Sequence, residues 1–164
     1  MILWLLPLAK LVLHLSTFAG YGIFRDELYY RACAEHLAVG YVDHPGLSIW
    51  ILWLVRQVLG DSLFALRLVP ALCGALTVFV IGRTARALGG GGFAQGLAMT
   101  AALIAPQYLG VGHYYSMNAF DLLAWSLAGY LVVRLCQDAQ PRWWILLGVV
   151  LGVGLANKIS LLWL

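Results

Sequence analysis

The stretch LFALRLVPALCGALTVFVIGR, residues 63–83, decides the fold class of this chain. Residues 68–82 carry no charge, and a helix of this length spans about 30 Å, the thickness of a bilayer core. The whole chain has the same character: 63% of its 164 residues are apolar and 10% are charged. A soluble domain has about 45–50% apolar and ~25% charged residues. The composition excludes a water-soluble fold and predicts a polytopic membrane protein.

Other charge-free intervals divide the chain into helices. The predicted fold is an all-α, polytopic transmembrane helical bundle of about five spans that occupies residues 1–164 as one unit. A sixth segment, Ile159 to Leu164, stops before it could cross, so we expect the chain to be the N-terminal part of a longer protein. The predicted spans lie near residues 2–20, 63–83, 93–110, 118–135 and 143–157.

The apolar run Leu47–Leu59 is treated differently from the spans. It is about 20 Å long as a helix, too short to cross ~30 Å of hydrocarbon. We therefore expect it to lie at the interface, within a first outer loop of about residues 21–62. Counting spans this way puts six of the seven acids on one side and leaves only Asp138 on the other. The six are Asp26, Glu27, Glu35, Asp43, Asp61 and Asp121.

The remaining composition excludes several function classes. A net charge of +3, spread over a mostly apolar chain, offers no cationic tail, so nucleic acid is not an expected partner. Three widely spaced cysteines indicate neither a disulfide framework nor a zinc site. We assign the acid-poor side with short loops to the cytoplasm, although the basic residues alone do not settle the orientation.

The densest polar cluster, Arg25 to Arg31, comes where the first span leaves the membrane. Residues Glu27 to Val39 are predicted to form a helix, with Glu27 and Arg31 on its polar face. Asp26 has two interpretations at the start of this helix. It can cap the helix by accepting backbone N–H bonds, or it can accept a proton from a hydroxyl nucleophile. The spacing leaves both open.

Two further polar segments carry candidate ligands. In the turn Gly40 to Gly46, Asp43 and His44 either bind a metal or phosphate or simply hydrogen-bond within the loop. In the segment His113 to Asp121, Asn118 and Asp121 are three residues apart and share one helix face, on the same side as Asp26. The alternative is an aromatic belt in which Ser116 or Asn118 caps the fourth span.

Two lysines lie in or next to predicted spans. Lys158 is either a snorkelling anchor or a phosphate partner. Lys10 and His14 face one direction within the first helix, which allows a proton relay, but no acid in another span matches their depth. We therefore favour a snorkelling Lys10.

Taken together, these motifs resemble the dolichyl-phosphate-mannose protein mannosyltransferase-like family. The closer resemblance is to its bacterial branch, which includes aminoarabinose lipid A transferase-like and rhizobial lipopolysaccharide galacturonosyltransferase-like enzymes. The matching segments are residues 25–30, 40–45, 64–68, 115–121 and 152–158. Gly46 departs from the pattern, because a second proline is common there.

The resemblance implies a GT-C fold and inverting transfer of a sugar from a polyprenyl-phosphate donor to an acceptor hydroxyl on a glycan, lipid or protein. Transfer would take place at the outer face of a bacterial inner membrane, facing the periplasm. Asp26 matches the catalytic Asp, and Arg31, His44, Lys158 or a divalent ion such as Mg²⁺ or Mn²⁺ would offset the charge of the departing phosphate. The recurrent polar positions expected to bind substrate are Glu27, Arg31, His44, Asn118, Asp121 and Lys158.

Two other function classes fit the same residues. A transporter or flippase of lipid-linked sugars would use the outer acids to bind its substrate without breaking a bond. A non-catalytic membrane scaffold would use Asp26 only as a helix cap, worth ~1 kcal/mol.

Overall fold

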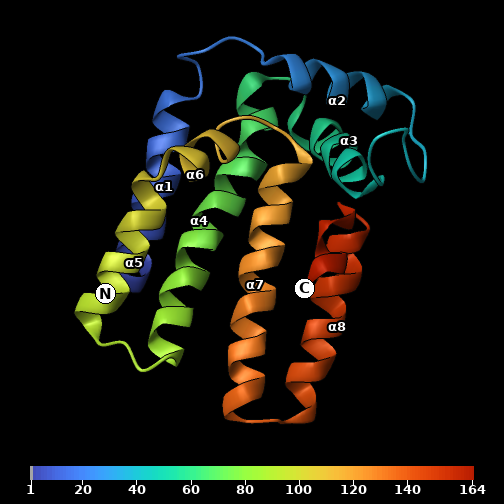
Figure 1. Cartoon of the computed structure of the whole chain (residues 1–164). Helices are drawn as coiled ribbons and strands as arrows, with labels where there is room; N and C mark the ends of the chain where they lie inside the picture. Colours follow the sequence, from blue (N-terminus) through green and yellow to red (C-terminus); the bar gives the residue numbers. More distant parts are fainter. Residues whose placement is uncertain (1) are drawn as a thin grey trace.

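The computed structural model describes residues 2–164, a range that contains helices and no β-strand (Figure 1). Its centre is α4 (Leu63–Ala87), which packs against α1 (Ile2–Thr17), α5 (Gly92–Ile104) and α7 (Met117–Gln137). The next helix, α8 (Pro141–Leu155), packs against α7. The chain thus has the all-α architecture that the sequence predicts.

The central position of α4 follows from its side chains. Ala71, Gly74, Ala75 and Gly82 are buried along it, and such small residues let neighbouring helix backbones approach closely. The Ser62 hydroxyl accepts the Ala65 N–H at 3.1 Å and so caps the start of this helix.

Two helices among residues 2–164, α4 and α7, are long and apolar enough to cross a membrane by themselves. The other apolar helices are shorter: α1 has 16 residues, α5 has 13 and α8 has 15. The number of spans therefore stays a prediction.

Two predicted segments differ from the structure. The predicted helix 93–110 is divided, because α5 ends before Ala105 and α6 (Pro106–Val111) starts anew. Pro106 has no N–H to continue the α5 ladder and restricts the residue before it. The last segment, Ile159–Trp163, forms a 3₁₀ helix (η1) where the start of a sixth span was expected.

The first outer loop forms two helices at one end of the bundle, α2 (Arg25–Glu35) and α3 (Leu47–Leu59) (Figure 1). The bounds of α3 are those predicted. The second helix begins two residues earlier than predicted and ends at Glu35 instead of Val39, with His36 as its C-cap. Its N-cap is Phe24, so the interpretation of Asp26 as the N-cap is wrong: Asp26 lies inside the first turn.

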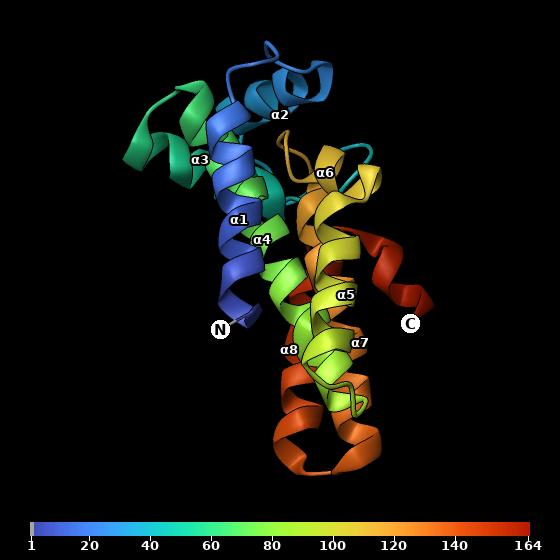
Figure 2. The same cartoon turned by 90° about the vertical axis from the view of Figure 1, so that its left-hand side faces the viewer.

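The two ends of the bundle differ (Figures 1 and 2). Helices α2, α3 and α6 lie at one end, here called the outer end, while the turns joining α4 to α5 and α7 to α8 lie at the other. Because the helices alternate in direction, motifs far apart in sequence meet at the outer end.

Candidate functional site

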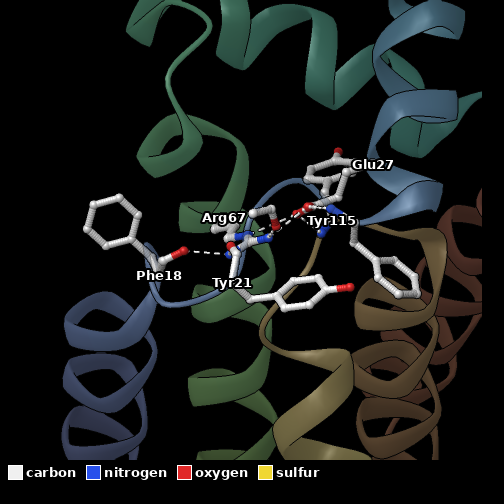
Figure 3. Close-up of polar contacts among 7 residues, drawn as sticks. Phe18, Tyr21, Glu27, Arg67 and Tyr115 are labelled. Atoms are coloured by element: carbon white, nitrogen blue, oxygen red, sulfur yellow. Dashed lines mark hydrogen bonds and ion pairs between the residues drawn. The ribbon is translucent and has the colours of Figure 1, made fainter.

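A buried ion pair joins the first outer loop to the central helix. Arg67 of α4 donates from Nε to Glu27 Oε1 at 3.0 Å and from Nη2 to Glu27 Oε2 at 2.9 Å (Figure 3). The two side chains are 2% and 0% exposed. Glu27 also accepts the backbone N–H of Phe24 at 2.8 Å and of Tyr115 at 3.0 Å. Four hydrogen bonds fill the acceptor sites of this carboxylate.

Arg67 uses its other donors on the chain that connects α1 to α2. Its Nη1 donates to the carbonyls of Phe18 and Tyr21, and its Nη2 donates to the carbonyl of Gly22 at 2.7 Å. We call Glu27, Arg67 and the backbone groups they bind the Glu27 cluster. Arg67 is missing from the candidate residues chosen from sequence. Its position inside a predicted span could have identified it, because ionisable groups there are costly unless they are paired.

A second junction forms at the first residue of α7. The Met117 N–H donates to the Tyr30 hydroxyl at 3.0 Å, and the Met117 carbonyl accepts from Asn157 Nδ2 at 2.9 Å. The Ser116 hydroxyl accepts the Asn118 N–H at 3.3 Å, so Ser116, and not Asn118, is the N-cap. The backbone of Met117 thus holds three segments together: α2, the start of α7 and the end of α8.

Asn118, Asp121 and Lys158, three predicted substrate ligands, come together beside this junction. Lys158 Nζ donates to Asn118 Oδ1 at 2.9 Å and lies 3.4 Å from Asp121 Oδ2. The Ser160 hydroxyl, which also accepts from Trp125, donates to Asp121 Oδ1. The Lys158 and Asp121 side chains remain 31% and 14% exposed. We call these residues, with Ser160, the Lys158 cluster.

Asp26 lies next to Glu27 but in a different environment. Its side chain is 38% exposed, and its one ion-pair partner within residues 2–164 is Arg25, which is 88% exposed. Asp26 precedes Tyr30 by one helical turn, so the two share a face of α2. Burial, together with the nearby charges of Asp43 and Asp26, raises the pKa of the Tyr30 phenol to about 12.

His44 is buried among tyrosines. Its ring stacks on Tyr30 with centroids 5.1 Å apart, and its Nδ1 lies 2.8 Å from the Pro45 carbonyl. The other ring nitrogen, Nε2, is buried and has no partner among the described residues. His44 therefore contacts α2 through Tyr30, the residue that also holds the start of α7.

The remaining charges of the outer loop form a separate group. Arg56 of α3 pairs with Asp61 and with Glu35, and its Nη1 donates to the Arg31 carbonyl at 3.1 Å. The guanidinium of Arg56 holds the pKa of Asp61 below its usual range. Arg31 is thus placed beside the Arg56–Asp61 pair.

Asp43 pairs with an aromatic hydroxyl. The Tyr29 hydroxyl donates to Asp43 Oδ1 at 2.6 Å. This bond lowers the pKa of Asp43 and raises the pKa of Tyr29, because it stabilises the carboxylate and retains the phenolic proton. The residues of the turn thus hydrogen-bond within the loop.

Comparison with known proteins identifies the family. The family model described as dolichyl-phosphate-mannose-protein mannosyltransferase matches residues 43–164. The chain belongs to this family. Its members are membrane-embedded glycosyltransferases of the GT-C type. No curated protein and no solved structure matches the chain.

The family match includes one of the two clusters completely. All of the Lys158 cluster, together with His44 and Arg67, lies within residues 43–164. Asp26, Glu27 and Arg31 precede the matched range. Arg67 connects the two parts, since it lies inside the range and binds Glu27 outside it.

A metal site was an open expectation for this mannosyltransferase-family chain. Within residues 2–164 no three His, Cys, Asp or Glu side chains come together as metal ligands. The described residues therefore offer no set of ligands for the Mg²⁺ or Mn²⁺ suggested from sequence. The proposed reaction step uses no metal ion.

Lys10 does not snorkel, contrary to the interpretation favoured from sequence. It is fully buried, and its Nζ donates to the Leu103 carbonyl at 3.1 Å. Leu103 lies in the last turn of α5, just before the break at Pro106, where helix carbonyls lose their usual partners. Lys10 thus closes the end of α5.

Proposed function

We propose that this glycosyltransferase transfers a sugar from a polyprenyl-phosphate donor to an acceptor hydroxyl at the outer face of a bacterial inner membrane, with inversion and with Asp26 as general base. The acceptor is a glycan, a lipid or a protein. Family membership supports the reaction class. The choice of the base rests on the environment of the acids.

The observation that carries this choice is a comparison of the six outer-end acids. Five of them bind a partner that is not their neighbour in sequence: Glu27 has Arg67, Glu35 and Asp61 have Arg56, Asp43 has Tyr29, and Asp121 has Lys158 and Ser160. Asp26 has only the exposed and adjacent Arg25, a kind of pair worth ~0–1 kcal/mol. A general base needs a free lone pair within reach of the proton it abstracts, and Asp26 meets that requirement best.

The proposed step conserves atoms and charge. The acceptor oxygen attacks the anomeric carbon from the face opposite the phosphate, and its proton passes to the Asp26 carboxylate. The bond between the anomeric carbon and the phosphate oxygen breaks, and the lipid phosphate leaves with the electron pair. Attack opposite the leaving group inverts the configuration at that carbon.

Lys158 is the cation that we place nearest the departing phosphate. Its ammonium is partly exposed and shares a cluster with Asn118 and Asp121, so it can exchange one hydrogen bond for a phosphate oxygen. His44, which stacks on Tyr30, would assist from the neighbouring turn, whereas Arg31 lies in the separate group around Arg56. Glu27, with its oxygens saturated, would contribute by holding α2 in place.

The test is Asp26→Asn in the full-length protein, assayed as release of polyprenyl phosphate from a panel of radiolabelled polyprenyl-phosphate hexoses and pentoses. The amide cannot take the proton, so we expect turnover to fall by about 10²–10⁴-fold. Glu35→Gln is the matched control, because it makes the same acid-to-amide change at the exposed end of the same helix. The control is expected to keep its turnover.

Three outcomes overturn the proposal. Normal turnover by Asp26→Asn removes Asp26 as the base. Movement of intact lipid-linked sugar across vesicles, with no release of polyprenyl phosphate by the wild type, assigns a flippase. A wild type that neither cleaves nor moves the lipid, and for which Asp26→Asn changes only the unfolding free energy, assigns a scaffold.

A further inference from the structure

Three arginines surround one pocket at the end of the bundle opposite the candidate site. The pocket has a volume of about 310 Å³ and lies between the last turns of α4 and α7. Its walls are Arg83, Arg86 and Ala87 from α4, and Tyr130, Arg134 and Gln137 from α7. We call this the arginine pocket. Gln137 also donates to the Ala87 carbonyl, which ties the two helices together beside it.

The positive charge of the arginine pocket is not neutralised by the protein. No acid lines it, and within residues 2–164 none of its arginines forms an ion pair. Asp138, the one acid in this part of the sequence, pairs with none of them. At the outer end, by contrast, Arg56, Arg67 and Lys158 each have a carboxylate partner.

Arg134 adds a feature that a solvated arginine lacks. Its Nε is buried and has no hydrogen-bond partner among the described residues. Its guanidinium lies over the Trp143 ring at 4.9 Å, and that of Arg142 lies over the same ring at 4.7 Å. The pocket thus brings Arg83, Arg86 and Arg134 together and leaves a buried donor of Arg134 open, an arrangement that an anion stabilises.

The position of the pocket determines which anion it meets. The chain belongs to a membrane-embedded family, and α4 and α7, whose ends form the pocket, are its two long apolar helices. Their outer ends carry the candidate site, so their other ends reach the headgroups of the opposite leaflet. Arginine binds phosphate through paired N–H donors, and basic pockets between membrane helices bind anionic headgroups.

The geometry points to a binding site for the phosphate of an anionic phospholipid, formed by Arg83, Arg86 and Arg134 in the leaflet opposite the candidate active site. A simple snorkelling anchor would have its arginines spread around the helix ends. Here they come from two helices to one pocket, and one of them has a buried and unused donor.

The test is native mass spectrometry of the full-length protein with phosphatidylglycerol or phosphatidylcholine. We expect phosphatidylglycerol to remain bound in preference, and the double variant Arg83→Gln/Arg86→Gln to lower its retention by about tenfold or more, as loss of charge-assisted hydrogen bonds predicts. Both residues are exposed, so this variant should fold. Arg134→Gln is expected to have the same effect. Arg142→Gln removes the same charge near the pocket without removing a wall of it, and should keep the lipid.

Equal retention of the two lipids by the wild type would overturn the proposal. So would equal losses from Arg142→Gln and the double variant, because they would indicate diffuse attraction by any positive charge. Calorimetric titration with inorganic phosphate separates the two sources of the anion. Binding of inorganic phosphate as tight as that of phosphatidylglycerol would reassign the pocket to a soluble anion.

Discussion

The Glu27 cluster and the Lys158 cluster lie at the same end of the molecule and are each built around an acid and a base. In the Glu27 cluster the paired side chains are 0% and 2% exposed, while in the Lys158 cluster they are 14% and 31% exposed. The Glu27 cluster is buried and has no free acceptor, since every oxygen lone pair of Glu27 accepts a hydrogen bond. The Lys158 cluster is partly exposed, so its groups can exchange partners. The same kind of ion pair therefore stabilises the fold in one place and remains available to a ligand in the other.

The largest expected effect comes from breaking the Glu27 cluster. Glu27→Gln leaves the charge of Arg67 buried without its counter-ion, and we expect the free energy of unfolding to fall by about 3–5 kcal/mol. Chemical denaturation of the full-length protein in detergent measures this loss. Glu35→Gln, whose side chain is 60% exposed, should cost no more than ~1 kcal/mol. A Glu27→Gln variant as stable as Glu35→Gln would show that the buried pair does not hold the outer loop.

The next effect separates catalysis from stability in the Lys158 cluster. Lys158→Gln should lower sugar transfer by about 10²–10³-fold, the usual cost of one lost electrostatic donor. Its cost in unfolding free energy should be only ~1 kcal/mol, because the pair is partly solvated. Lys158→Arg keeps the charge and should recover part of the activity. If the fall in unfolding free energy accounted for the whole loss of sugar transfer, the proposed role of Lys158 in catalysis would be contradicted.

The smallest effect concerns Asp43, an exposed acid with a neutral partner. The Tyr29 hydrogen bond lowers the pKa of Asp43 in the folded protein. A carboxyl group with a lowered pKa stabilises the fold above its unfolded pKa of ~3.9, and this contribution disappears as the pH falls through the folded value. Tyr29→Phe should therefore lower the Tm slightly at neutral pH, and the difference from the wild type should shrink in acid. A difference that is constant with pH would show that lost packing, and not Asp43, explains it.

The backbone around position 46 has a physical reason for its glycine, the residue at which the chain departs from the pattern described above. A Cβ atom at this position would lie 2.7 Å from the Val39 carbonyl oxygen and 2.8 Å from that of Ala38. The Gly46 N–H also donates to the Val39 carbonyl at 3.2 Å, a bond that proline cannot make. The turn is closed around a glycine, so the second proline that the resemblance leads us to expect does not fit here.

Several local features were predictable because they depend on neighbours in sequence. The short apolar helix 47–59 has the predicted bounds, since Pro45 and Gly60 interrupt the chain on either side. Ser62 and Ser116 cap their helices as serines next to apolar runs do. Two local expectations were wrong. Asp26 is not the N-cap, and the helix expected over 93–110 breaks at Pro106.

The sequence by itself determined the helical class, the sidedness of the acids and the family motifs, because hydropathy and helix periodicity are properties of neighbouring residues. Only the tertiary structure decided which charges are partnered. It brings Arg67 to Glu27 across 40 positions and Lys158 to Asn118 across another 40. The energy of a charge depends on its burial and its partners, and both are set by segments that meet only when the chain folds. That is why Glu27 and Asp26, adjacent in the chain, have different environments.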